Sequence, residues 1–314
     1  MPGMTPAASK ADPPSGQQLE IVRGEQRAVV VEVGGGIRSY AVGEHDVLES
    51  YAVDAICDGA HGAVLAPWPN RLEDGRYTFD GQAYQLPLSE PATHNAIHGL
   101  LRWTPWRPQR WSADHVAVTA RVHPQPGYPF DLEVTVGYRL GDDGLHVTTT
   151  ATNRGDRACP YGSGQHPYLS AGGGPLDGCT FAMDARTRLV TDPQRQLPQG
   201  HDPVARTPYD FRSPRLFGDQ RLDDPFTDLD RDSDGRAWGR LTGTDGLVRE
   251  LWVGPAYPYL EAFSGDTLAP HRQRRALALE PMTCPPNALR SGESLVRLEP
   301  GESTVAEWGV RLSG

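Results

Sequence analysis

The strongest constraint on the fold is a succession of short β-type segments, separated by turn residues, that continues along the whole chain. Residues 18–22 and 27–33 alternate polar and apolar side chains, and similar segments recur towards the C-terminus. Alternation with a period of two places every second side chain on the same face of a strand. Strands are therefore predicted at residues 18–22, 27–33, 76–79, 82–86, 116–120, 132–138, 145–150, 247–253, 276–280, 294–298 and 304–312.

The turn signals between these segments favour antiparallel pairing. Asp80-Gly81 separates two predicted strands and is typical of a type I′ hairpin. No stretch of ten residues has a convincing helical period, and strands do not alternate with helices, which disfavours a βαβ nucleotide-binding fold. We predict an all-β fold, a large antiparallel β-sandwich, in a single domain over residues 18–314. Residues 1–17, which lack a periodic apolar pattern, are expected to form a disordered tail.

Charge and residue usage exclude several classes of function. The formal net charge of −10 argues against a nucleic-acid partner. Lys10 is the only lysine. The predicted domain therefore has no lysine for a Schiff base and no Gly-Lys-Ser/Thr loop for nucleotide phosphates.

The apolar segments and the cysteines of the sequence indicate where the protein is located, and they favour the cytoplasm. The sequence contains neither an 18-residue apolar run nor, in its first 17 residues, the apolar core of a signal peptide. The four scattered cysteines form no Cys-x-x-Cys pair, so they are predicted to be buried thiols. We expect a cytoplasmic protein with no membrane contact, present as a monomer or homodimer.

Two histidines and one glutamate, far apart in sequence, are candidates for one acid–base site. His98 lies in the string Asn95-Ala96-Ile97-His98-Gly99, His166 precedes Pro167, and Glu280 ends an apolar strand. Either histidine alone could be a loop residue bonded to the backbone. A carboxylate at the end of an apolar strand is costly to bury without partners, and a positioned base is one reason to keep it there.

Five motifs, in order along residues 20–312, resemble those of the aldose 1-epimerase (galactose mutarotase) family. The motifs are Pro69-Asn70-Arg71-Leu72-Glu73-Asp74-Gly75, Asn95-Ala96-Ile97-His98-Gly99, His166-Pro167-Tyr168-Leu169, Leu222-Asp223-Asp224-Pro225-Phe226 and Leu279-Glu280-Pro281. The resemblance implies a galactose mutarotase-like β-supersandwich that interconverts the α and β anomers of a free sugar.

The resemblance also implies roles for individual residues. Glu280 takes the position of the general base and His166 that of the general acid, with His98 assisting at the ring oxygen. The expected substrate-binding residues are Arg71, Asn70, Asp223 and Tyr168. Asp224 competes with Asp223 for the carboxylate that grips sugar hydroxyls.

The chemistry of mutarotation suits this set of side chains. Ring opening removes a proton from the C1 hydroxyl and donates one to the ring oxygen, so that a carboxylate and an imidazolium are sufficient. No cofactor and no metal are expected. His94 and His98 have i, i+4 spacing, but Asn95 stands where a zinc-protease helix needs glutamate.

One segment next to His98 departs from the family pattern and leaves the identity of the sugar open. Leu100-Leu101-Arg102-Trp103 replaces the glycine-rich run of galactose-type members. A hexose-6-phosphate 1-epimerase remains an alternative because Arg71, Arg76 and Arg102 could meet an anion. A non-catalytic carbohydrate-binding β-sandwich and a glycoside hydrolase using Glu280 and Asp223 remain open as well.

Overall fold

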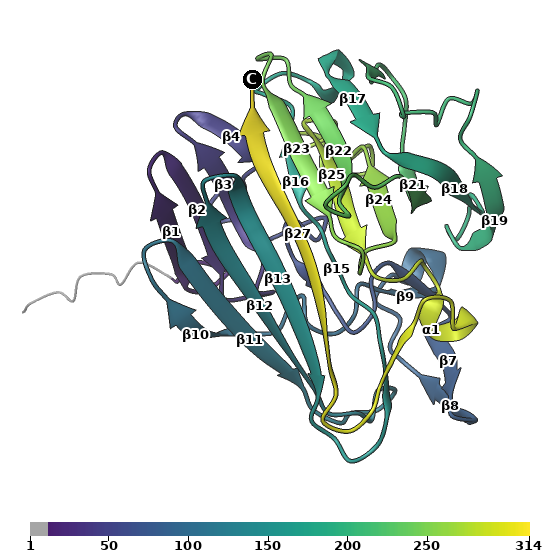
Figure 1. Ribbon diagram of the computed structural model, residues 1–314. Helices are drawn as coiled ribbons and strands as arrows, with labels where there is room; N and C mark the ends of the chain where they lie inside the picture. The colour runs from purple at the N-terminus through teal and green to yellow at the C-terminus, as the bar shows by residue number, and fades with distance from the viewer. Residues whose placement is uncertain (1–11) are drawn as a thin grey trace, which may run out of the picture.

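The computed structural model, which describes residues 12–314, consists of two large antiparallel sheets packed face to face (Figure 1). The first sheet runs in the order β1 (Gln18–Arg23), β2 (Gln26–Val31), β3 (Ile37–Val42), β4 (His45–Leu48), β16 (Tyr168–Ser170), β25 (Ala276–Met282), β24 (Tyr259–Phe263), β21 (Asp223–Leu229), β18 (Ala185–Thr191) and β19 (Pro198–Pro203). Two short strands, β5 (Val64–Leu65) and β15 (Gly164–Gln165), complete its twelve strands.

The second sheet has nine strands and no direct part in the cavity described below. Its order is β10 (Arg107–Trp111), β11 (His115–Val122), β12 (Leu132–Gly141), β13 (Gly144–Asn153), β27 (Ser303–Ser313), β23 (Val248–Val253), β22 (Ala237–Thr242), β17 (Thr180–Met183) and β20 (Arg215–Leu216). The predicted all-β sandwich is therefore confirmed.

Three small two-stranded sheets and a few helical turns complete the described chain. The pairs are β14 (Cys159–Tyr161) with β26 (Val296–Leu298), β6 (Arg71–Glu73) with β9 (Asn95–Ile97), and β7 (Arg76–Phe79) with β8 (Gln82–Gln85). The helical turns are η1 (Pro91–Thr93), η2 (Leu176–Gly178) and α1 (Ala288–Ser291). In Figure 1 the β7–β8 hairpin and α1 lie at the lower right of the view, below β21, β18 and β19.

Each predicted strand corresponds to an observed strand, and the predicted and observed ends differ by at most three residues. The predicted type I′ turn is also confirmed, because Asp80 and Gly81 both have positive φ, 50° and 75°, between β7 and β8. The expected tail lies outside the described residues up to position 11. Residues 12–17 are described, and there the carbonyl of Ser15 accepts a hydrogen bond from the Val33 N–H.

The hydrophobic core lies between the two sheets. Leu277 and Leu279 of β25 belong to the same cluster as Leu251 and Trp308 of the second sheet. Ala276 and Ala278, which alternate with these leucines, pack instead with Tyr168 in a separate cluster. Strand β25 is thus covered on both faces, and the face that carries Ala278 and Glu280 points away from the second sheet.

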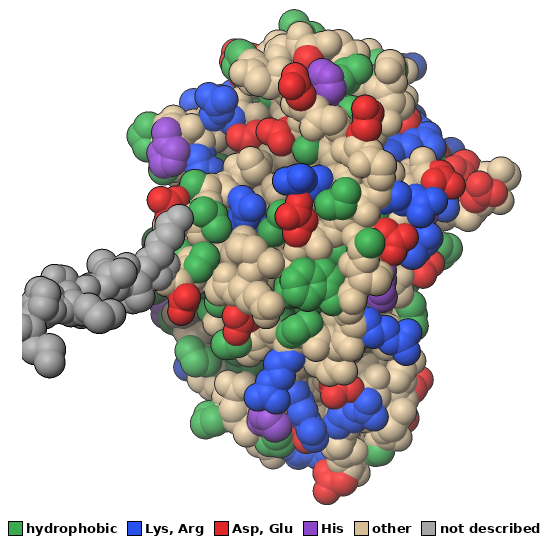
Figure 2. Space-filling model, turned by 90° about the vertical axis from the view of Figure 1, so that its left-hand side faces the viewer, with side chains coloured by type: hydrophobic (Ala, Val, Ile, Leu, Met, Phe, Trp, Pro, Cys, Tyr) green, Lys and Arg blue, Asp and Glu red, His purple; other side chains and the backbone are tan. Residues whose placement is uncertain are grey.

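The described residues show a mixed surface charge and free cysteines. Acidic and basic side chains are interspersed on the face shown in Figure 2. Cys159, Cys179 and Cys284 are buried free thiols, and Cys57 is half-buried. Among residues 12–314 no helix has the length and apolar character needed to cross a bilayer.

Gly62 illustrates how tightly the loop before β5 is fixed. Its φ is +69°, its N–H donates to the His166 carbonyl over 2.8 Å, and its carbonyl accepts from the Ile37 N–H. A Cβ at this position would lie 1.9 Å from the Ile37 oxygen. Only glycine fits, because both the positive φ and the close backbone approach exclude a side chain.

We predict that Gly62→Ala lowers the free energy of unfolding by roughly 3 kcal/mol or more, at the upper end of single substitutions. The matched control is Gly246→Ala, because Gly246 has a φ of +81° but a Cβ there would meet no atom of the described residues within 4 Å. Urea unfolding of both variants measures the difference. Equal losses of stability would contradict the steric argument.

Candidate active site

A cavity of about 410 Å³ lies on the outer face of the twelve-stranded sheet. Loops around residues 58–60, 89–90, 97–102 and 267–269 surround it. The ionisable and aromatic side chains in its wall are Asp58, Arg71, Glu90, His98, Arg102, His166, Asp223, Phe263 and Glu280. A volume of this order is at the lower end of the range for small-molecule sites.

Strand register places several of these side chains together. Glu280 of β25 lies directly opposite Glu261 of β24, and Phe263 of β24 lies opposite Asp223 of β21. Residues two apart on a strand share a face, so Glu261 and Phe263 point to the same side of the sheet. The four side chains therefore share the face that bears the cavity.

The predicted acid and base are in direct contact. His166 Nε2 lies 3.1 Å from Glu280 Oε1, and the two side chains are 6% and 3% exposed. Within the described chain, Glu280 Oε2 and His166 Nδ1 have no hydrogen-bond partner. Glu280 thus keeps one oxygen free while the other is joined to the imidazole.

Burial shifts the pKa values of this pair in opposite directions. Burial, reinforced by the charge of Asp223 and opposed by Arg71, raises the pKa of Glu280 well above the usual range. Burial also lowers the pKa of His166 to about 3. Both shifts favour the uncharged forms, a protonated carboxyl for Glu280 and a neutral imidazole for His166. The imidazolium expected from the sequence is therefore disfavoured by burial until a proton is transferred to it.

A stack of rings fixes the orientation of His166. Its ring is stacked on that of Tyr168 at 4.9 Å, and His61 stacks on the other face of Tyr168 at 4.6 Å. The Tyr168 hydroxyl donates to the Gly59 carbonyl over 2.8 Å. Tyr168, expected to bind substrate, does not line the cavity and instead packs behind His166.

Backbone hydrogen bonds set the tautomer of His98. The Asn70 N–H donates to His98 Nδ1 over 3.3 Å, and the His98 N–H donates to the Asn70 carbonyl over 3.0 Å. Nδ1 therefore accepts, and the ring proton resides on Nε2. Burial, with the neighbouring His166 and Arg102, lowers the pKa of His98 well below the usual range. His98 is a neutral hydrogen-bond donor in the cavity wall.

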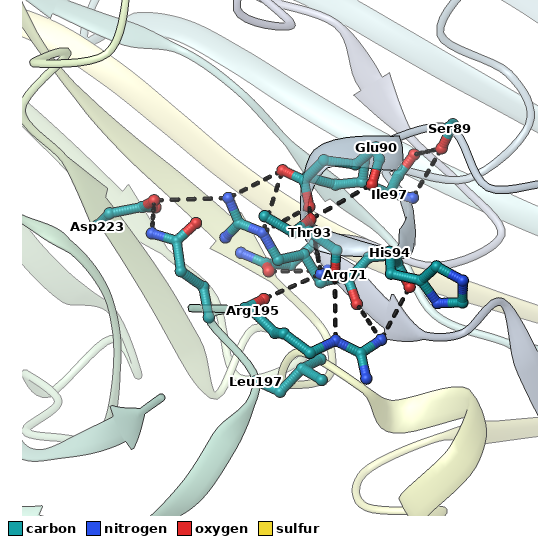
Figure 3. Close-up of polar contacts among 12 residues, drawn as sticks. Arg71, Ser89, Glu90, Thr93, His94, Ile97, Arg195, Leu197 and Asp223 are labelled. Carbon is teal, nitrogen blue, oxygen red and sulfur yellow. Dashed lines mark hydrogen bonds and ion pairs between the residues drawn. The ribbon is translucent and has the colours of Figure 1, made fainter. Parts of the chain in front are cut away.

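Arg71 joins two acidic groups across the site, as Figure 3 shows. Arg71 Nε lies 3.1 Å from Glu90 Oε2, and Arg71 Nη2 lies 3.5 Å from Asp223 Oδ2. The Gln196 side-chain amide also donates to Asp223. These contacts hold the Asp223 carboxylate at the cavity wall.

The structure separates the two competing aspartates. Asp223 lines the cavity, whereas Asp224, on the opposite face of β21, forms an ion pair with Arg188 at 2.6 Å. Asn70 lines the cavity as expected, and its side chain also bonds the carboxyl of Glu261 over 3.1 Å. Asp223 is thus in place to meet a ligand, and Asp224 is engaged elsewhere.

Three residues of the site, Glu90, Phe263 and Glu261, were not found from the sequence. Glu90 and Phe263 line the cavity, and Glu261 lies next to Glu280. Glu261 interrupts the apolar pattern of β24, as Glu280 interrupts that of β25, and this signal could have identified it. Glu90 lies in a polar loop and had no comparable signal. No group of three or more His, Cys, Asp or Glu suited to a metal ion occurs among residues 12–314.

A buried carboxyl–imidazole pair facing a cavity rimmed by polar side chains defines an acid–base site for a small polar molecule. The sequence profile of the family described as aldose 1-epimerase matches residues 17–311. The chain belongs to the aldose 1-epimerase family.

Individual relatives agree with this assignment. The uncharacterized protein YihR of Escherichia coli is 32% identical over 289 residues, covering 92% of this chain and 91% of its own. An aldose 1-epimerase of Escherichia coli is 28% identical, with 79% of each chain covered. The solved structure of a GalM/aldose epimerase homologue from C. elegans shares the fold with a TM-score of 0.84 at 19% identity, covering 95% of this chain and 98% of that one.

We predict that the imidazole of His166 stays neutral at pH 5, because burial lowers its pKa to about 3. Imidazole ¹⁵N NMR across a pH series would measure its titration, with the signal assigned by its loss in His166→Gln. The urea-unfolded chain serves as control, since its histidines should titrate near the ordinary value of about 6.5. A folded-state midpoint for His166 close to that of the unfolded chain would refute the prediction.

Proposed function

We propose that the protein is an aldose 1-epimerase that interconverts the α and β anomers of a free hexose or a related sugar. The observation that carries the proposal is the contact between Glu280 and His166 at the cavity wall, where Glu280 Oε2 has no hydrogen-bond partner among residues 12–314. In a cyclic hemiacetal the C1 hydroxyl and the ring oxygen are bonded to the same carbon. A base and an acid that act on both oxygens must therefore lie side by side, as this pair does.

The proposed reaction begins with the one proton that the pair shares. Its transfer along the contact from Glu280 to His166 gives a carboxylate and an imidazolium. The carboxylate removes the proton of the C1 hydroxyl, and a C1 carbonyl forms as the bond from C1 to the ring oxygen breaks. The electron pair passes to the ring oxygen, which takes the proton of His166.

Ring closure reverses these transfers on the other face of the carbonyl. After rotation about the C1–C2 bond, the freed hydroxyl attacks C1, His166 takes its proton, and Glu280 returns a proton to the carbonyl oxygen. The proton then passes back along the contact from His166 to Glu280, so that both residues end in their starting states and no cofactor is consumed. Burial of the pair places the pKa of Glu280 above its usual range, which makes its carboxylate a better base.

The surrounding side chains support binding of a polyhydroxylated ligand. His98 offers an Nε2–H donor close to His166, whose ring centroid lies 5.5 Å away. Asp223 and Glu90, bridged by Arg71, offer acceptors for hydroxyl groups. In the proposed site His98 assists at the ring oxygen and Asp223 accepts hydrogen bonds from sugar hydroxyls. Arg71 and Asn70 bind and orient the sugar. Tyr168 contributes by supporting His166.

We predict that Glu280→Gln slows anomer exchange by roughly 10²–10⁴-fold, because the amide cannot accept the C1 hydroxyl proton. Exchange-spectroscopy NMR on glucose, galactose and other aldoses measures the rate at equilibrium. Glu250→Gln is the control, since Glu250 is a largely buried carboxylate of the second sheet outside the cavity.

Two outcomes would contradict the proposal. Equal rates for Glu280→Gln and the wild type would exclude the mechanism. Saturable sugar binding by the wild type, without acceleration of exchange for any aldose, would indicate a non-catalytic carbohydrate-binding protein.

A second candidate is an epimerase for sugars that carry an anionic group, such as hexose 6-phosphates. Arg102 favours it, because this arginine lines the cavity and no carboxylate lies within 4 Å of its guanidinium among residues 12–314. By contrast, Arg71 is paired with Glu90 and Asp223. Partial burial lowers the pKa of Arg102, and a bound anion would offset that cost.

For this second candidate, we predict that Arg102→Gln lowers kcat/KM for an anionic hexose by about 10-fold or more, as loss of a charge-assisted hydrogen bond would. The rate for the matching neutral hexose should change little. Parallel NMR assays of glucose, glucose 6-phosphate and a 6-sulfonated analogue would test this. Equal effects on the neutral and anionic sugars would rule out an anion-binding role.

A further inference from the structure

Glu261 is a buried carboxyl beside the site, and the proposed mechanism gives it no role. It is 1% exposed and lies on β24 directly opposite Glu280, on the same face of the sheet. It does not line the cavity. An acidic side chain is costly to bury, so its surroundings should show what it does there.

The only hydrogen bond to the Glu261 side chain among the described residues comes from Asn70. Asn70 Nδ2 donates to Glu261 Oε2 over 3.1 Å. This contact links the edge of the small β6–β9 sheet to the centre of the twelve-stranded sheet. It is the polar connection between the loop that carries Asn70 and the strand beside the proposed base.

Asn70 in turn orients two residues of the site. Its backbone N–H fixes the tautomer of His98, and its side-chain oxygen accepts from the Arg71 N–H over 2.8 Å. Asn70 has a φ of 52°, a left-handed conformation that costs energy in a non-glycine residue. The bond to Glu261 helps to hold that conformation, and with it the placement of His98 and Arg71.

Burial and the neighbouring charges favour the neutral form of Glu261. Burial raises its pKa well above the usual range, and the charges of Asp223 and Glu280 add to the shift. Arg71 opposes the shift, and Asp224 adds to it. The ionisable groups around Glu261 and Glu280, from every strand or loop packed against them, are Arg71, His98, His166, Tyr168, Asp223 and Asp224.

We propose that Glu261 is a positioning residue that works as a neutral carboxyl, holding Asn70 so that His98 and Arg71 face the sugar. The inference rests on the proposed epimerase function. Two negative charges directly opposite each other on paired strands destabilise a sheet. A neutral partner at position 261 therefore lets Glu280 become a carboxylate without that repulsion.

The test compares two substitutions at position 261. Glu261→Gln has the size of a protonated glutamate and keeps an oxygen that can accept from Asn70, so its kcat at neutral pH should stay close to that of the wild type. Glu261→Ala loses the contact, and kcat should fall by about 10²-fold, as small displacements of site groups do. Glu250→Gln and Glu250→Ala are matched controls on the second sheet.

A pH profile separates this role from a purely structural one. In the wild type, raising the pH ionises Glu261 and places two like charges on the β24–β25 pair, so that the rate should fall on the alkaline side. Glutamine cannot ionise, and Glu261→Gln should remain active to higher pH. Thermal unfolding of each variant shows whether a lost rate reflects lost folded protein.

A readout independent of activity keeps the two proposals distinguishable. Carboxyl ¹³C NMR of protein labelled at glutamate should show a group that titrates well above the ordinary value of about 4.3 and disappears in Glu261→Gln. An inactive wild type that shows this signal would refute the epimerase function and leave the neutral carboxyl standing. Absence of the signal, a folded Glu261→Ala with wild-type kcat, or a Glu261→Gln as slow as Glu261→Ala would overturn the inference.

Discussion

The contact between Glu280 and His166 is the interaction on which the organisation of the site depends. It joins a carboxyl and an imidazole where almost no solvent reaches either group. Burial disfavours the charged form of both groups, because it raises the pKa of Glu280 and lowers that of His166. Burying such a pair costs free energy, and Glu280 Oε2 has no hydrogen-bond partner within residues 12–314 to offset that cost.

The fold supplies the rigidity that this pair requires. Strand β25 is buried on both faces, with Leu277 and Leu279 in the core between the sheets and Glu280 on the other side. The ring stack of His61, Tyr168 and His166 fixes the imidazole from behind. Gly62, close against Ile37, holds the His166 carbonyl. The polar side chains of the site are therefore held by strand β25 and by neighbouring segments that are closely packed.

Much of the candidate site was predictable because its main residues lie in recognisable motifs. His98, His166, Glu280, Arg71, Asn70 and Asp223, named from five separated strings, all line one cavity. Tyr168 was expected to bind substrate but supports His166, because its hydroxyl is already bonded to the Gly59 carbonyl. Sequence could not separate Asp223 from Asp224. The alternation of β21 does so, since adjacent residues of a strand face opposite sides of the sheet.

The sequence by itself determined the class of fold and the β7–β8 hairpin, and it pointed to six residues that line one cavity: His98, His166, Glu280, Arg71, Asn70 and Asp223. Period-two alternation, turn dipeptides and short motifs are local properties of the chain. Only the tertiary structure decided that Glu261 stands opposite Glu280, that Glu90 and Phe263 line the cavity, and that the carboxyl of Glu280 contacts the imidazole of His166. Strand register and burial bring about these contacts between residues separated by up to about two hundred positions. They also set the proton affinities of the buried groups, which depend on neighbours that no local pattern specifies.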